Sequence, residues 1–112
     1  MLESVSAPDR LARQSADATR LLRALANEQR LLILCHLLST GEMPVSALVD
    51  QLGLSQSALS QHLARLREEG IVNYRREAQS LIYRVADEKA SRLLALLSEI
   101  YCPELTEKGA QP

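Results

Sequence analysis

The chain has 112 residues, which is enough for one domain and too short for two. We expect a single domain over residues 1–112 with a core of about 9–102, and flexible ends at 1–8 and after Pro103. Hydrophobic residues make up 46% of the chain, but only 3% are aromatic and Trp and Phe are absent. The core must therefore be built from Leu, Ile, Val and Ala, which favours packed helices over a sandwich of sheets.

The net charge is −1, but the basic residues are not evenly spread. Residues 55–84 carry five basic and three acidic groups, whereas the segments on both sides are net acidic. This excess is weak by itself, yet it marks the middle third of the chain as the candidate contact with nucleic acid.

Nothing in the sequence indicates a membrane or secreted protein. No run approaches the ~18 apolar residues of a transmembrane helix, and Glu3 and Asp9 interrupt the stretch where a signal peptide needs apolar residues. We therefore expect a cytoplasmic protein without membrane contact. In that compartment Cys35 and Cys102 are reduced at rest, and such a pair is more often redox-sensing or inert than a structural disulfide.

The first part of the chain is predicted to be helical. Apolar residues recur at helical spacing from about 9 to 25. Asn27 is placed to cap a second helix over 28–38, which is apolar nearly all round and therefore predicted to be buried. Residues 39–41 end that helix.

Two helices joined by a tight turn are predicted next. Residues 43–45 should be extended, because a proline disfavours helix in the residue before it, and Ser46 is placed to cap a short helix over 47–52. Gly53 suits the left-handed conformation that ends a helix, and Ser55 can cap a longer helix that ends near the next glycine. This is the helix-turn-helix pattern.

After this pair the sequence changes to strand character. Segments 71–76 and 81–85 are β-prone and are separated by a polar turn at 77–80. Asp87 is then placed to cap a last helix. The predicted fold is mainly α with a small β-hairpin, a winged helix-turn-helix with the element order α-α-α-α-β-β-α. The last helix carries one apolar stripe, formed by Ala90, Leu93, Leu94, Leu97, Ile100 and Tyr101.

The helix after Ser55 has the properties of a DNA-recognition helix. Leu59, Leu63 and Leu66 share one face and should point to the core. The opposite face presents short polar side chains and one arginine, which suit the major groove, where Gln pairs with adenine and Arg with guanine. A solvated surface helix is the alternative, but it leaves the lack of acidic residues unexplained. The predicted DNA contacts here are Ser55, Gln56, Ser57, Ser60, Gln61 and Arg65.

The hairpin carries further candidate contacts. Arg75, Arg76 and Gln79 could reach phosphates or the minor groove, and an exposed charged turn is the alternative. His62 lies beside the apolar stripe of the recognition helix, where a packing or hydrogen-bonding role is favoured over metal binding.

These segments resemble the ArsR/SmtB family of bacterial repressors. The resemblance rests on residues 25–34 (LANEQRLLIL), 54–63 (LSQSALSQHL) and 69–72 (EGIV) with the hairpin that follows, and it covers roughly 17–102. It implies a homodimer, paired through the first and last helices. Such a dimer binds double-stranded operator DNA and releases it when a signal arrives.

Many members of this family sense metals, but the metal-site patterns do not match here. One pattern needs a Cys-x-Cys pair where this chain has Pro-Val-Ser at 44–46, and another needs histidines on the last helix, which has Asp87, Glu88 and Glu99 but no histidine. We therefore expect no metal ligands and no cofactor, and metal sensing stays an alternative only.

Cys35 and Cys102 resemble the cysteines of a subgroup that responds to sulfide, persulfide or oxidants through two thiols, although the loop at 39–43 looks slightly longer than in that subgroup. The resemblance implies that reactive sulfur species bridge the two cysteines and switch off operator binding. The alternatives are two inert thiols, or the same fold sensing peroxide or a metal. A thiol enzyme is less favoured, because no basic residue is predictably beside either cysteine; we expect no catalytic residues.

Overall fold

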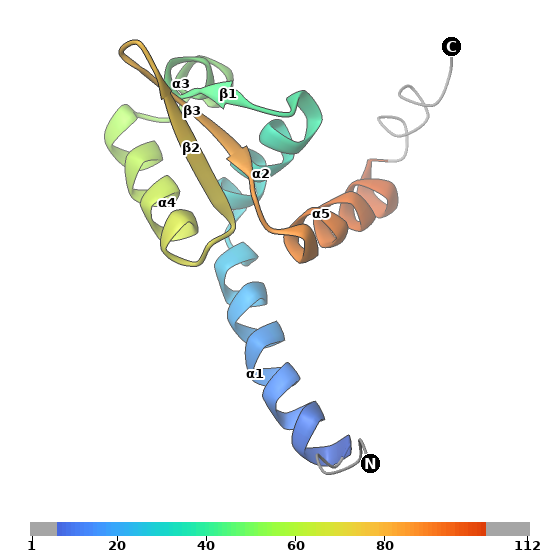
Figure 1. Ribbon diagram of the computed structural model, residues 1–112. Helices are drawn as coiled ribbons and strands as arrows, with labels where there is room; N and C mark the ends of the chain where they lie inside the picture. Colours follow the sequence, from blue (N-terminus) through green and yellow to red (C-terminus); the bar gives the residue numbers. More distant parts are fainter. Residues whose placement is uncertain (1–6, 103–112) are drawn as a thin grey trace.

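The computed structural model describes residues 7–102, and the remaining terminal residues lie outside it. The predicted flexible ends fall mostly in those termini, but Ala7 and Pro8 belong to the first helix. The elements, shown in Figure 1, are α1 (Ala7–Leu25), α2 (Glu28–Thr40), β1 (Met43–Pro44), α3 (Val45–Leu52), α4 (Gln56–Glu68), β2 (Val72–Glu77), β3 (Ser80–Val85) and α5 (Glu88–Tyr101). The predicted winged helix-turn-helix is confirmed.

Three helices begin directly after the residues whose side chains were predicted to cap them. The side-chain oxygens of Asn27, Ser55 and Asp87 each accept a hydrogen bond from the backbone N–H three residues later, over 3.0, 3.0 and 2.8 Å. Each bond satisfies one of the amides that the first turn of a helix leaves without a partner. The starts of α2, α4 and α5 are therefore local properties of the sequence.

The helix-turn-helix is formed by α3 and α4. Gly53 ends α3 in the left-handed conformation, with φ 68°, as predicted. The predicted start of α3 is wrong, because the helix begins at Val45 and not after Ser46. Pro44 precedes the helix without any side-chain capping bond, and its ring holds it in the extended conformation, with φ −73° and ψ 154°.

The sheet has three strands in the order β1-β3-β2 and not the two of the predicted hairpin. The extended segment at Met43–Pro44 pairs antiparallel with β3, with Met43 opposite Tyr83. The turn of the hairpin is also shorter than predicted. Glu77 pairs with Ser80, so only the two residues between them form the turn. The first of them, Ala78, adopts the left-handed conformation with φ 56°.

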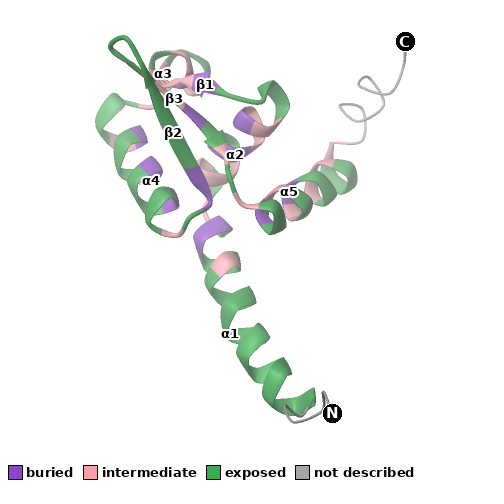
Figure 2. Ribbon diagram, viewed as in Figure 1, coloured by how far each residue is buried: buried purple, intermediate pink, exposed green. Residues whose placement is uncertain are grey.

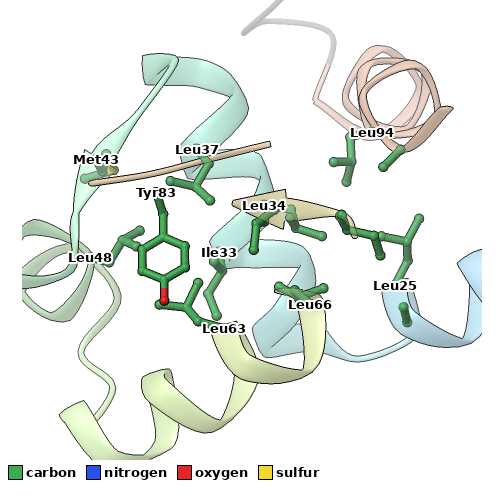
Figure 3. Close-up of a cluster of buried hydrophobic side chains, with 14 of the residues drawn as sticks. Leu25, Ile33, Leu34, Leu37, Met43, Leu48, Leu63, Leu66, Tyr83 and Leu94 are labelled. Atoms are coloured by element: carbon green, nitrogen blue, oxygen red, sulfur yellow. The ribbon is translucent and has the colours of Figure 1, made fainter. Parts of the chain in front are cut away.

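One cluster of buried side chains joins all of these elements. Ile33, Leu34 and Leu37 of α2 are fully buried at its centre, and Tyr83 of β3 packs among them (Figure 3). The predicted burial of α2 is confirmed for these three residues, but the opposite side of the helix is open, because Leu32 is 47% exposed. The three leucines of α4 predicted to face the core are all buried: Leu59, Leu63 and Leu66.

The helix α1 stands apart from the rest. It projects from the body of the molecule and is exposed over most of its length, with only Ala24 and Leu25 buried at its end (Figures 1 and 2). α5 packs against α2 at the side. None of the helices in residues 7–102 combines the length and apolar character needed to cross a membrane.

Candidate DNA-binding surface and cysteine pair

The outward side of α4 is polar and fully accessible. Its three buried leucines hold the helix on the core, which leaves the opposite side to solvent. All six residues of this segment that were predicted to contact DNA are exposed: Ser55, Gln56, Ser57, Ser60, Gln61 and Arg65. Exposure is what DNA contact requires, and the contacts themselves stay predictions.

These side chains divide into two strips. We call the β2–β3 hairpin the wing. Gln56 and Ser60 line an open groove of about 890 Å³ between α3, α4 and the wing. Gln79 at the tip of the wing lines the same groove. The fold therefore brings three of the predicted contacts together from two distant segments. The other strip, which we call the outer strip, consists of Ser57, Gln61 and Arg65, which follow one another at helical spacing outside the groove.

In the wing, the two arginines differ in their surroundings. Arg75 forms ion pairs with Glu42, in the loop before β1, and with Glu77, whose Oε2 lies 3.1 Å from its Nη2. Arg76 is exposed and has no ion pair within the described part of the chain. Arg76 is therefore available to a DNA phosphate at once, whereas Arg75 must first leave its carboxylate partners.

This pairing leads to a test at Glu42. We expect Glu42→Gln to raise affinity for DNA up to about fivefold at low salt. An exposed ion pair is worth about 0–1 kcal/mol, and in this variant Glu42 no longer competes with phosphate for Arg75. Fluorescence anisotropy in a salt series measures this gain. Glu99→Gln on α5 is the control for charge alone. If the gain persists in an Arg75→Gln background, competition for Arg75 is not its cause.

Sequence reasoning missed the structural roles of two arginines. Arg67 lines the groove and holds its guanidinium carbon 4.9 Å from the ring centre of Tyr74, a cation–π contact between α4 and the wing. Arg30 at the start of α2 donates to backbone carbonyl groups at the end of α1. The basic character of Arg67 was a visible signal, but the roles of both residues depend on tertiary contacts.

The two cysteines come from different helices and meet at one site. Cys35 lies in α2 and Cys102 directly follows α5, and both are half-buried free thiols. Burial raises the pKa of the Cys35 thiol, a hydrogen bond with the Ser98 side chain acts to lower it, and the nearby Cys102 raises it further. Ser98 also accepts the backbone N–H of Cys102 on its carbonyl, over 2.8 Å. Sequence reasoning did not single out Ser98.

The described residues contain no group of three or more His, Cys, Asp or Glu side chains placed to hold a metal ion. His62 is half-buried at the edge of the leucine stripe of α4. The site of Cys35, Cys102 and Ser98 offers two thiols and a hydroxyl next to apolar side chains. Such a site can support sulfur exchange, but it is a poor site for a divalent metal.

Comparison with known proteins agrees with this geometry. Residues 27–74 match the family model for bacterial regulatory proteins of the arsR family. The transcriptional activator HlyU of Vibrio cholerae is 49% identical over 92 residues, which are 82% of this chain and 84% of that protein. This chain belongs to the ArsR family. It is accordingly a transcriptional regulator and not a thiol enzyme.

Two further relatives of this ArsR-family regulator are informative. The biofilm growth-associated repressor of Agrobacterium fabrum is 41% identical over 92 residues, covering 82% of this chain and 78% of that protein. The solved structure of reduced HlyU from Vibrio cholerae superposes with a TM-score of 0.80 at 48% identity, covering 83% of this chain and 97% of that one. The winged fold and the regulator class are thus shared over most of both chains.

Proposed function

We propose that this ArsR-family regulator is a dimeric repressor that leaves its operator when reactive sulfur species bridge Cys35 and Cys102. The observation that carries the proposal is that the two thiols, 67 positions apart in the chain, lie close enough for Cys102 to influence the pKa of Cys35. The Agrobacterium relative is named a repressor, which supports this direction of regulation, whereas the Vibrio relative is named an activator.

Apolar side chains left exposed on the terminal helices support the dimer. A groove of about 680 Å³ runs between α1 and α5 and includes Leu21, Leu93 and Leu96 in its lining. A projecting helix with unpartnered leucines is unusual in a monomer, and a second copy related by two-fold symmetry would cover them. The large apolar residues exposed on these helices are Leu11, Leu22, Leu96, Ile100 and Tyr101.

The chemistry can be written as two exchanges with an organic trisulfide. Cys102 attacks first, because the raised pKa of Cys35 disfavours its thiolate. The Cys102 thiolate bonds to the central sulfur and one alkyl thiolate leaves. Cys35, after losing its proton to water, then attacks that same sulfur and expels the second alkyl thiolate. The product is a one-sulfur bridge between the cysteines, with both electron pairs carried away by the two leaving thiolates.

The bridge would link α2 in the core to the end of α5 on the proposed dimer face. Any shift of α5 against α2 then changes the separation of the two recognition helices. Half-sites lie about 34–36 Å apart on one face of DNA, so a small change in this separation weakens binding. A coupling of this kind is worth about 5- to 150-fold in affinity.

The test uses a duplex of about 30 base pairs selected by the reduced wild-type protein from a random pool, long enough for two half-sites. We expect dialkyl trisulfide to lower the affinity of the wild type by about 5- to 150-fold, and to leave Cys35→Ser and Cys102→Ser unchanged. Intact mass should rise by one sulfur minus two hydrogens. Normal release by either variant would show that the bridge is not the switch.

The same experiment separates the alternatives. Peroxide sensing predicts a loss of two hydrogens without added sulfur after hydrogen peroxide, together with loss of DNA binding. Metal sensing predicts that a metal ion releases DNA from the double variant Cys35→Ser/Cys102→Ser as well, unless the thiols are its ligands. The absence of a three-ligand cluster among residues 7–102 makes this outcome less favoured.

A further inference from the structure

An aromatic contact links the wing to the recognition helix. Arg67, near the end of α4, places its guanidinium carbon 4.9 Å from the ring centre of Tyr74 on β2. The ring of Tyr74 lies in turn 5.2 Å, centre to centre, from that of Tyr83 on β3, at an angle of 45°. Tyr83 is only 6% exposed and packs in the core, whereas Tyr74 is 37% exposed. The three side chains form a continuous stack from the core through the wing to α4, which we call the aromatic stack.

The register of the wing places Arg76 on the same face as the aromatic stack. Successive side chains of a strand point to opposite sides, so Tyr74 and Arg76 share one face of β2, and Arg75 lies on the other. Arg76 stands opposite Leu81, which lines the groove next to α4. Arg75, on the other face, is occupied by its ion pairs. The face of the wing that meets Arg67 therefore also presents Arg76 for DNA contact.

The stack contacts the wing at its root. β2 is an edge strand, because the strand order is β1-β3-β2, and all of its residues after Val72 are exposed. A two-stranded hairpin is only marginally stable by itself, so the direction of the wing depends on what its root packs against. Tyr74 lies in that root, where β2 contacts α4, and the tip projects from the body of the molecule (Figure 1). A small rotation at the root therefore moves the tip most.

We propose that Arg67 is a positioning residue for DNA binding, which holds the wing at the angle where Arg76 reaches a backbone phosphate while α4 lies in the major groove. The inference rests on the proposed DNA-binding function and names how its two contact surfaces are kept in register. Within residues 7–102 the ion pairs all belong to Arg75, so Arg67 is held by the ring of Tyr74 and not by a carboxylate. Direct phosphate contact by Arg67 is the alternative, because Arg67 also lines the groove.

Replacing Tyr74 separates these two roles, because the substitution changes no charge. We expect Tyr74→Leu to lower affinity for the selected duplex about two- to fivefold, which is the value of one exposed cation–π contact. The dependence of affinity on salt should become shallower, because Arg76 no longer fully engages its phosphate. Arg67→Gln should lose as much affinity, and the double variant no more than either single one. Tyr74→Phe keeps the ring and should restore binding. Fluorescence anisotropy in a salt series measures all four variants.

A double-mutant cycle with the wing tests the positioning itself. Arg76→Gln should weaken wild-type binding and cost less in the Tyr74→Leu background, because the displaced wing has already lost part of that contact. Gln61→Ala on α4 should keep its full effect in the same background. Arg84→Gln, exposed on the opposite face of the wing, is the charge-matched control for Arg67→Gln and should bind as the wild type does. Thermal unfolding checks the fold of each variant.

The outcomes that contradict the proposal are distinct. Full affinity of Tyr74→Leu together with weakened binding by Arg67→Gln would show that Arg67 contacts phosphate directly. Additive effects of Tyr74→Leu and Arg76→Gln, with an unchanged salt dependence, would show that the stack contributes only to stability. In both cases the positioning role is wrong although DNA binding stands. If the wild type selects no duplex, the proposed function fails and this inference fails with it.

Discussion

Leu22→Glu is expected to convert the regulator into a monomer and to lower its affinity for the selected duplex by about 100-fold or more. Leu22 is 55% exposed on α1. Burying one leucine contributes about 1.5–3 kcal/mol, and a two-fold interface contains the residue twice. Placing a carboxylate in that interface adds the cost of removing its charge from water. A monomer then contacts a single half-site and approaches non-specific binding.

Sedimentation equilibrium measures the mass, and fluorescence anisotropy measures the affinity on the same samples. Ala16→Glu is the matched control, because Ala16 is exposed on the same helix about 120° around its axis from Leu22. It introduces the same charge into α1 and should stay dimeric. A dimeric Leu22→Glu, or two equally monomeric variants, would contradict the proposed interface.

Gln61→Ala is expected to weaken binding to the selected duplex by about 5- to 150-fold, which corresponds to about 1–3 kcal/mol. Gln61 is exposed in the middle of the outer strip. A glutamine there can form two hydrogen bonds with the edge of an adenine, and alanine forms none. The variant should also tolerate substitutions at one base pair that the wild type rejects.

The measurement compares the selected duplex, its single-base variants and a scrambled duplex. Affinity for the scrambled duplex should stay unchanged, because non-specific binding depends on phosphates and not on base edges. Gln51→Ala on α3, exposed and outside the predicted contact strips, is the control. An equal loss on selected and scrambled DNA would show that Gln61 does not read a base.

The local features of the molecule follow directly from short stretches of sequence. Asn27, Ser55 and Asp87 cap their helices through bonds to residues only three positions away. The left-handed turn at Gly53 follows in the same way, as does the burial of the leucine stripe that turns the polar side of α4 outward. One failure is local as well: α3 begins directly after Pro44 and not after Ser46, because the proline ring holds Pro44 at φ −73° in the extended conformation of a residue that precedes a helix.

The sequence by itself therefore determined the winged helix-turn-helix, its family and the exposed recognition strip, because caps, glycines and leucine spacing act within one or two helical turns. Only the tertiary structure decided that Met43 joins the sheet as part of a third strand, and that Arg75 pairs with Glu42, 33 positions away. The same holds for Arg30 bonding to the carbonyl of Ala24 at the end of α1 and for Ser98 bonding to Cys35. Such pairs form when packed helices and strands bring distant residues together, and no short sequence pattern encodes that packing.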